Sequence, residues 1–107
     1  MAEDRLILVY TTLASPEQAE ALGNALVREK LAACVNIFPG MKAIYQWRGA
    51  LEQGQETAMI IKSRAARQKA LLARAKELHP YETPALLVLP VESGAEAFAA
   101  WVREQTG

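Results

Sequence analysis

The chain has 107 residues, of which 51% are apolar and 22% charged, and we expect residues 1–107 to form a single globular domain. Twelve Lys and Arg residues balance twelve Asp and Glu residues, which argues against a nucleic-acid-binding protein because such proteins carry a basic face. No apolar run approaches the roughly 20 residues that span a bilayer, and the acidic N-terminus lacks the basic start of a signal peptide. The single cysteine, Cys34, allows no disulfide within the chain. We therefore expect a cytoplasmic protein with no membrane partner.

The first predicted elements are a strand over residues 5–12 and a helix over about 16–31. The strand is apolar almost throughout, which is typical of a central strand or of one buried on both faces. Ser15 is a favourable N-cap, Pro16 suits the first helical position, and Gln18 completes a capping box. One stripe of the helix carries apolar side chains at helical spacing: Ala19, Leu22, Leu26 and Leu31.

The middle of the chain, residues 33–62, predicts one long and bent β-hairpin. Pro39 and Gly40 interrupt its first arm with residues typical of a turn or a bulge. The predicted parts are strands over 33–38 and 43–48, a reversal over 49–55 that contains two glycines, and a returning strand over 56–62.

The last part of the chain predicts a helix, a short strand and a final helix. Ser63 is expected to cap a helix over about 64–78, which ends because the residue before Pro80 is pushed out of the α region. The apolar run over 84–90 predicts a strand, and a capping box at 93–96 opens the final helix.

The predicted order, β-α-β-β-α-β plus a helix, indicates an α+β fold, a ferredoxin-like βαββαβ sandwich with an extra C-terminal helix. Two helices would then cover one face of a mixed antiparallel sheet. The other face is apolar as well, since Leu6, Leu8 and Tyr10 alternate with Ile7 and Val9. A soluble monomer avoids so large an exposed apolar face, so we expect the chain to self-associate.

Three segments in order resemble the signature blocks of the CutA divalent-cation-tolerance family: LAACVNI with PG at 31–40, IYQWRG at 44–49, and ELHPYE at 77–82. The resemblance extends over about residues 6–104. It implies a ferredoxin-like homotrimer, similar in architecture to the PII signalling proteins, in which three sheets pack around a central axis. It also implies a role in tolerance to divalent cations, copper especially, and metal binding.

The candidate metal ligands are His79, Glu82 and Cys34. An imidazole suits copper or zinc, a carboxylate follows it three residues later, and a thiolate suits soft metals. The alternatives are that His79 bonds the last carbonyls of its helix and that Cys34 is a small buried apolar side chain. With one His and one Cys, a chain cannot form a four-ligand site of those residues alone. We therefore expect weak binding that uses carboxylates or several protomers.

A second candidate site consists of Tyr45, Trp47, Lys62 and Tyr81. Tyr45 and Trp47 are two residues apart and share one face of a strand. With a lysine and the nearby carboxylate of Glu82, they are expected to line a small-molecule pocket between protomers. The alternative is a subunit interface in which Lys62 pairs with an acidic residue, Glu82 or Glu56.

No nucleotide-binding loop, and no catalytic Ser-His-Asp or Cys-His arrangement, is recognisable in the chain. The first hypothesis is therefore a non-enzymatic homotrimer that binds copper or another divalent cation. The alternative is a PII-like sensor or signalling scaffold, which binds a small metabolite between protomers and acts on a protein partner.

Overall fold

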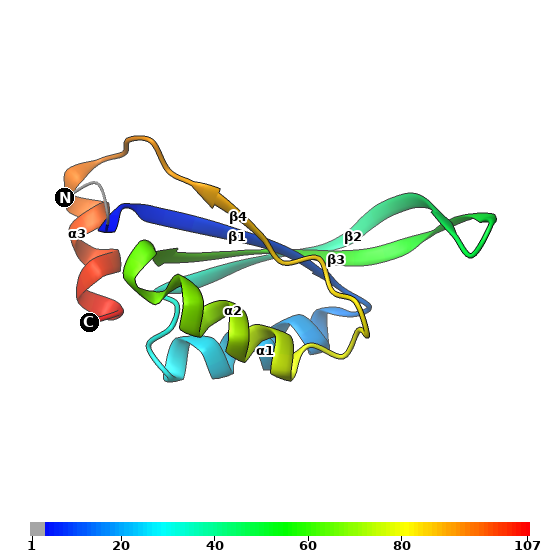
Figure 1. Ribbon diagram of the computed structural model, residues 1–107, viewed down its shortest axis with the longest axis horizontal. Coiled ribbons are helices and arrows are strands. Elements are labelled where there is room, and N and C mark those ends of the chain that lie inside the picture. Colours follow the sequence, from blue (N-terminus) through cyan, green and yellow to red (C-terminus); the bar gives the residue numbers. More distant parts are fainter. Residues whose placement is uncertain (1–3) are drawn as a thin grey trace.

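A four-stranded sheet with two helices on one of its faces forms the body of the protein (Figure 1). The computed structural model describes residues 4–107. Its elements are β1 (Leu6–Leu13), α1 (Pro16–Arg28), β2 (Cys34–Trp47), β3 (Ala50–Arg64), the 3₁₀ turn η2 (Ala65–Arg67), α2 (Gln68–Leu78), β4 (Leu87–Pro90) and α3 (Glu96–Gln105).

The strand order is β2-β3-β1-β4, and all three pairings are antiparallel. This order confirms the α+β, ferredoxin-like arrangement, with an antiparallel rather than a mixed sheet. Figure 1 shows α1 and α2 side by side below the sheet and α3 at the end where the chain begins.

The core lies between the sheet and the two helices. Ile7, Val9 and Leu13 of β1 are buried on the helix side, as the predicted alternation requires. Their neighbours Leu6, Leu8, Tyr10 and Thr12 are half-buried and point to the opposite face, which is called the open face below.

The predicted start of α1 is confirmed, and its predicted end is wrong. The Ser15 hydroxyl accepts a hydrogen bond from the Gln18 N–H at 3.2 Å, and the Gln18 side chain accepts one from the Ala14 N–H at 3.1 Å. The helix ends at Arg28, because Lys30 takes a left-handed conformation with φ of 61°. No glycine marks this end in the sequence, which explains the overextended prediction.

The long hairpin is confirmed, but its reversal is not where it was predicted. The register shifts between Phe38 and Met41, as the predicted bulge requires, and Gly40 has φ of +77°. The chain reverses at Arg48 and Gly49, both with positive φ, so β3 begins at Ala50. A two-residue turn of this conformation matches the twist of paired strands. The hairpin therefore extends well beyond the rest of the sheet (Figure 1).

Two predicted helix caps are wrong. Ser63 lies within β3, and its hydroxyl donates a hydrogen bond to the Leu31 carbonyl at 2.7 Å. The chain then forms the 3₁₀ turn before α2. At α3 the N-cap is Ala95, without a side-chain hydrogen bond, and β4 begins at Leu87 rather than at residue 84.

Arg64 holds both ends of the described chain together. Its guanidinium donates to the Asp4 carboxylate at 2.8 Å and to the Thr106 hydroxyl and carbonyl at 2.9 and 2.8 Å. Since one planar group binds both residues, the first strand and the last helix are fixed against each other. No helix within residues 4–107 is long and apolar enough to span a bilayer.

Candidate functional site

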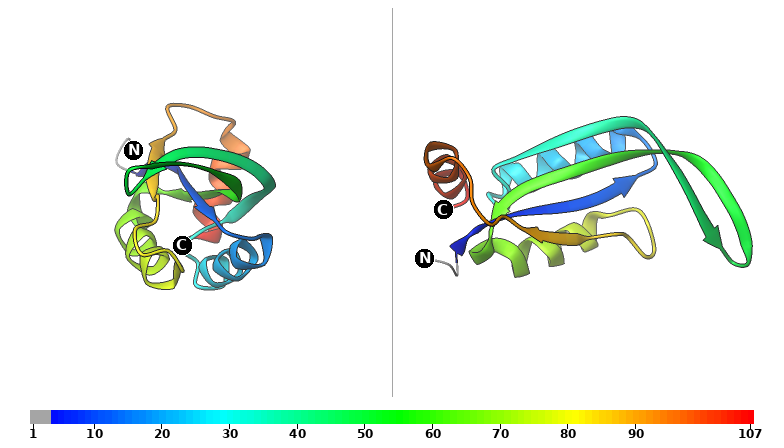
Figure 2. Two further views of the ribbon diagram at one scale, coloured as in Figure 1. Left: turned by 90° about the vertical axis from the view of Figure 1, so that its right-hand side faces the viewer. Right: turned by 90° about the horizontal axis from the view of Figure 1, so that it is seen from above.

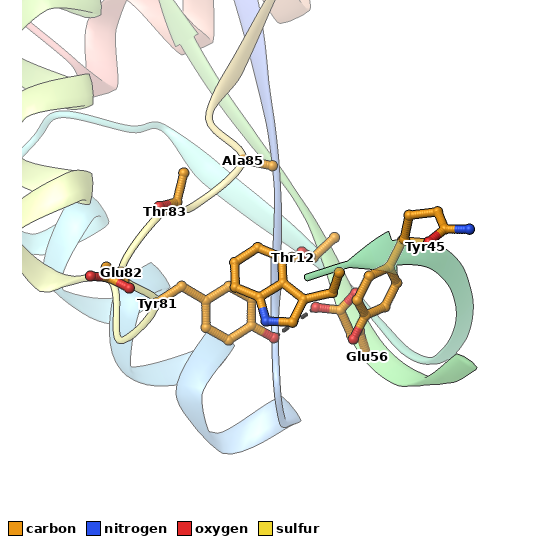
Figure 3. Close-up of a pocket in the computed structure, with 9 residues that line it drawn as sticks. Thr12, Tyr45, Glu56, Tyr81, Glu82, Thr83 and Ala85 are labelled. Atoms are coloured by element: carbon orange, nitrogen blue, oxygen red, sulfur yellow. Dashed lines mark hydrogen bonds between the residues drawn. The ribbon is translucent and has the colours of Figure 1, made fainter. Parts of the chain in front are cut away.

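A cleft of about 710 Å³ lies between the curved hairpin and the loop that follows α2. Figure 2 shows the hairpin bending around toward this loop, which is drawn in yellow. The residues that line the cleft are Thr12, Tyr45, Gln46, Trp47, Glu56, Tyr81, Glu82, Thr83 and Ala85 (Figure 3). Its walls therefore come from β1, both arms of the hairpin, and the loop before β4.

Local sequence rules explain how these side chains meet. Tyr45 and Trp47 alternate with Gln46 on β2, so both rings project from one face of the hairpin. Glu56 lies on β3 opposite Met41. Pro80 cannot continue the α2 helix, so the chain turns there and places Tyr81 against the hairpin.

The contact between Tyr81 and Glu56 closes one end of the cleft. The Tyr81 hydroxyl donates a hydrogen bond to Glu56 Oε2 at 2.7 Å, which Figure 3 shows as a dashed line. Burial, and then the hydrogen bond to this negative carboxylate, raise the pKa of Tyr81 well above its usual value. The phenol therefore stays neutral and keeps donating to Glu56 at physiological pH.

His79 connects α2 to β1 beside the cleft. It is 7% exposed, and its Nε2 lies 3.0 Å from the Thr12 carbonyl and 3.1 Å from the Thr11 hydroxyl. Its Nδ1 accepts a hydrogen bond from the Tyr81 N–H at 3.1 Å. A carbonyl only accepts and an amide only donates, so these partners fix the neutral tautomer protonated at Nε2. The ring thus bonds β1 and the loop rather than the last carbonyls of its helix.

The hydrogen bonds of His79 bear directly on its predicted role as a metal ligand. Burial lowers its pKa and outweighs the opposite effect of the bond to Thr12, so the imidazole is neutral, as metal binding requires. Both ring nitrogens nevertheless have partners already. An ion at Nδ1 would have to displace the Tyr81 N–H.

Cys34 and Lys62 lie apart from the cleft. They are direct partners across β2 and β3, and Lys62 also faces Leu8 on the open face. Lys62 is six residues from Glu56 along β3, which is roughly 20 Å of extended chain. Its ammonium group lies 5.4 Å from the ring centre of Phe98.

Neither of the ion pairs proposed for Lys62 forms within one chain. Among residues 4–107, the ion pairs are Arg64 with Asp4, and Arg74 with Glu29 and Glu77. Glu56 instead accepts the bond from Tyr81, and Glu82 is exposed at the rim of the cleft.

One chain therefore gathers Tyr45, Trp47, Tyr81 and Glu82 of the predicted site residues in one cleft. His79 lies directly behind them, with its ring centre 4.9 Å from that of Tyr81. Within residues 4–107, no group of three or more His, Cys, Asp or Glu side chains could hold a metal ion together.

Glu56 is the central residue that the sequence reasoning left out of the site. Its position in the site depends on the register of the hairpin. That register could not be derived from the sequence, because the reversal was predicted over residues 49–55 rather than at Arg48 and Gly49. A turn at Arg48 and Gly49 places Glu52 opposite Tyr45 and Glu56 opposite Met41. In this register Glu56 shares a face with Tyr45 and Trp47, because its partner Met41 is four and six residues before them on the same strand.

Comparison with known proteins shows similarity over nearly the whole chain. Residues 7–105 match the family model described as CutA1 divalent ion tolerance protein. The divalent-cation tolerance protein CutA of Pectobacterium atrosepticum is 43% identical over 96 residues, which are 90% of this chain and 87% of that protein. The protein of the same name from Thermus thermophilus is 41% identical over 100 residues, 94% of this chain and 97% of its own length. The crystal structure of the divalent ion tolerance protein CutA1 from Ehrlichia chaffeensis superposes with a TM-score of 0.94 at 30% identity, covering 97% of each chain.

Proposed function

Because the chain belongs to the CutA1 divalent ion tolerance family, we propose that it binds divalent cations, copper first, as a non-enzymatic homotrimer in the cytoplasm. The observation that carries this proposal is the grouping of donors around one short loop. The Glu82 carboxylate lines the cleft with that of Glu56, and the His79 imidazole lies behind Tyr81. Carboxylate oxygens and imidazole nitrogens are ligands that divalent first-row metals use.

The donors of one chain do not make a closed metal site. Within residues 4–107 no three such side chains converge, whereas structural zinc sites use four ligands. Cys34, the third predicted ligand, is on the open face opposite Lys62 and does not line the cleft. Its thiol could bind a metal ion only at a second site or at a site formed between copies of the chain. We therefore expect modest affinity, with water or another protomer completing the coordination.

Calorimetric titration of the metal-free protein with CuCl₂ and with ZnCl₂ tests this proposal. Glu82→Gln and His79→Gln are each expected to weaken copper binding about tenfold or more, since they remove a donor. Cys34→Ser tests the separate thiol site. Glu20→Gln removes the same charge from an exposed position on α1 and should leave binding unchanged. If Glu82→Gln and His79→Gln both bind copper like the parent protein, the proposed ligands are wrong. Cell fractionation with an antibody checks the location.

The homotrimer would cover the open face of the sheet. Phe38, Leu87 and Leu89 are 49%, 58% and 48% exposed in the single chain, and they surround the half-buried Tyr10 and Ile60. Burying such a face stabilises an assembly by roughly 25 cal/mol for each Å² of apolar surface. The number three rests on the family resemblance.

A second candidate function is a sensor that binds a small metabolite. It is favoured by the size of the cleft, about 710 Å³, which is within the range of sites for small organic ligands. A bare metal ion needs far less space. In this function the bound molecule would change how the assembly contacts a protein partner.

A further inference from the structure

The charges of the cleft are unbalanced. Of the nine residues that line it, Glu56 and Glu82 are acidic, and none is Lys, Arg or His. The only lysine predicted for this site, Lys62, lies elsewhere on the open face. An anionic ligand would meet two negative charges among the lining residues, whereas the Arg48 guanidinium beside the Trp47 ring supplies a single positive charge.

Three aromatic rings stand next to these carboxylates. Tyr45 and Trp47 come from one face of β2, and Tyr81 comes from the loop opposite. The faces of aromatic rings carry negative electrostatic potential and attract cations, the indole of tryptophan most strongly. Trp47 already shows this attraction, since the Arg48 guanidinium lies 5.5 Å from its ring centre. That group can cover only one face of the indole.

Glu56 is placed to bind a charge beside these aromatic rings. The Tyr81 hydroxyl fixes its Oε2, and it is half-buried. Its other oxygen, Oε1, has no hydrogen-bond or ion-pair partner among residues 4–107. A carboxylate that is fixed in position loses little conformational freedom when it binds a cation.

We propose that the cleft binds a small organic cation, with its ammonium group between the rings of Tyr45, Trp47 and Tyr81 and against Glu56. This inference rests on the second candidate function, in which the cleft is the ligand site. It names the class of ligand as an alkylammonium ion. The aromatic rings would contact its carbon atoms, the carboxylate would balance its charge, and Glu82 at the rim would attract it from solution.

Choline and its uncharged isostere, 3,3-dimethylbutan-1-ol, are suitable probes because they differ in charge and hardly in shape. The chain contains two tryptophans, Trp47 and Trp101. In a Trp101→Phe background the fluorescence of Trp47 therefore reports on the cleft alone. Each probe is titrated into the full chain at low salt with EDTA present, so that no metal ion takes part. We expect choline to change the fluorescence saturably, and its isostere to bind at least about tenfold more weakly.

Variants of the lining residues test whether choline binds in the cleft. Binding to the Trp47 variant is measured by calorimetry, because that variant lacks the fluorescent side chain. Glu56→Gln keeps the acceptor for Tyr81 and removes the charge, so choline binding should weaken about tenfold. Trp47→Leu should weaken it by a similar factor. Glu20→Gln removes an equal charge from α1 and should have no effect beyond that of ionic strength. Native mass spectrometry of each variant shows whether the assembly is intact.

Several results would overturn the inference. They are equal binding of choline and its isostere, binding that Glu56→Gln does not weaken, and no binding of choline by an intact assembly. Copper titration is a separate measurement. If copper binds and choline does not, the metal function stands and the inference about the organic cation is wrong.

Discussion

His79 shapes the cleft through its neighbours without lining it. Nε2 donates to Thr12 and Nδ1 accepts from Tyr81, and both of these residues line the cleft. One buried imidazole thus sets the position of the end of β1 relative to the loop before β4. Protonation at Nδ1 would convert an acceptor into a donor facing the Tyr81 N–H.

The stability of the protein should therefore decrease in mild acid. Burial holds the pKa of His79 below its ordinary value, so the unfolded chain takes up the proton first as the pH falls. The contribution to stability is complete above the unfolded pKa of about 6.5 and is lost as the pH falls through the lower folded pKa. Urea unfolding at several values between about pH 8 and pH 5, at one protein concentration, measures this loss. In His79→Gln the dependence on pH should be flatter, and an unchanged dependence would assign it to other groups.

At the scale of elements, α1 packs closely against the sheet. Gly23 is buried in the middle of the helix. A Cβ atom at this position would lie 2.8 Å from Val35 Cγ2 and 3.0 Å from Met59 Cε. The missing side chain lets the helix approach β2 and β3 closely.

Gly23→Ala should consequently destabilise the fold, although alanine favours helices by about 1 kcal/mol. Overpacking a core costs about 1–3 kcal/mol, and Val35 is short and branched, so it cannot move aside easily. We expect a net loss of about 1 kcal/mol in the free energy of unfolding. Gly54→Ala is the control, because nothing lies within 4 Å of its added Cβ. A Gly23→Ala protein as stable as its parent would show that the helix can shift without cost.

The order and type of the elements could be predicted from the sequence because periodicity and caps are local. The wrong predictions concern turns and helix ends, where a residue other than the most common one takes the position. Arg48 precedes Gly49 in a turn that usually begins with Asn, Asp or Gly, Lys30 takes the place of a C-terminal glycine, and Ser63 bonds Leu31 from within a strand. The aromatic pair follows from a spacing of two residues. The bond from Tyr81 to Glu56 spans 25 residues and depends on how the hairpin curves, which no local pattern specifies.

At the scale of the whole molecule, the two faces of the sheet differ. One is sealed by α1 and α2, while the open face exposes Leu87 and Leu89 of β4, paired with Tyr10 and Leu8 of β1. The principal extents of the chain, 45 × 26 × 22 Å, reflect a hairpin that reaches beyond the body of its own chain. Both features are expected of a subunit that packs against copies of itself.

Leu89→Glu should weaken this association, since it places a charge on the exposed apolar edge strand of the open face. Native mass spectrometry should give three chains for the parent protein and mainly single chains for the variant. Val27→Glu changes an apolar residue of α1 that is 40% exposed and should leave the mass unchanged. If Leu89→Glu retains the mass of the parent protein, the open face is not the contact between copies.

Arg64 donates hydrogen bonds to both Asp4 and Thr106, and this proximity matters for circular permutation of the polypeptide. Two residues that share one guanidinium are near enough for a short flexible linker to join the end of α3 to the start of β1. New ends could then be opened in the exposed turn at Arg48 and Gly49, where few contacts would be lost. Such a circular permutant would keep the same sheet order while making β2 and β3 the last and first strands to be synthesised.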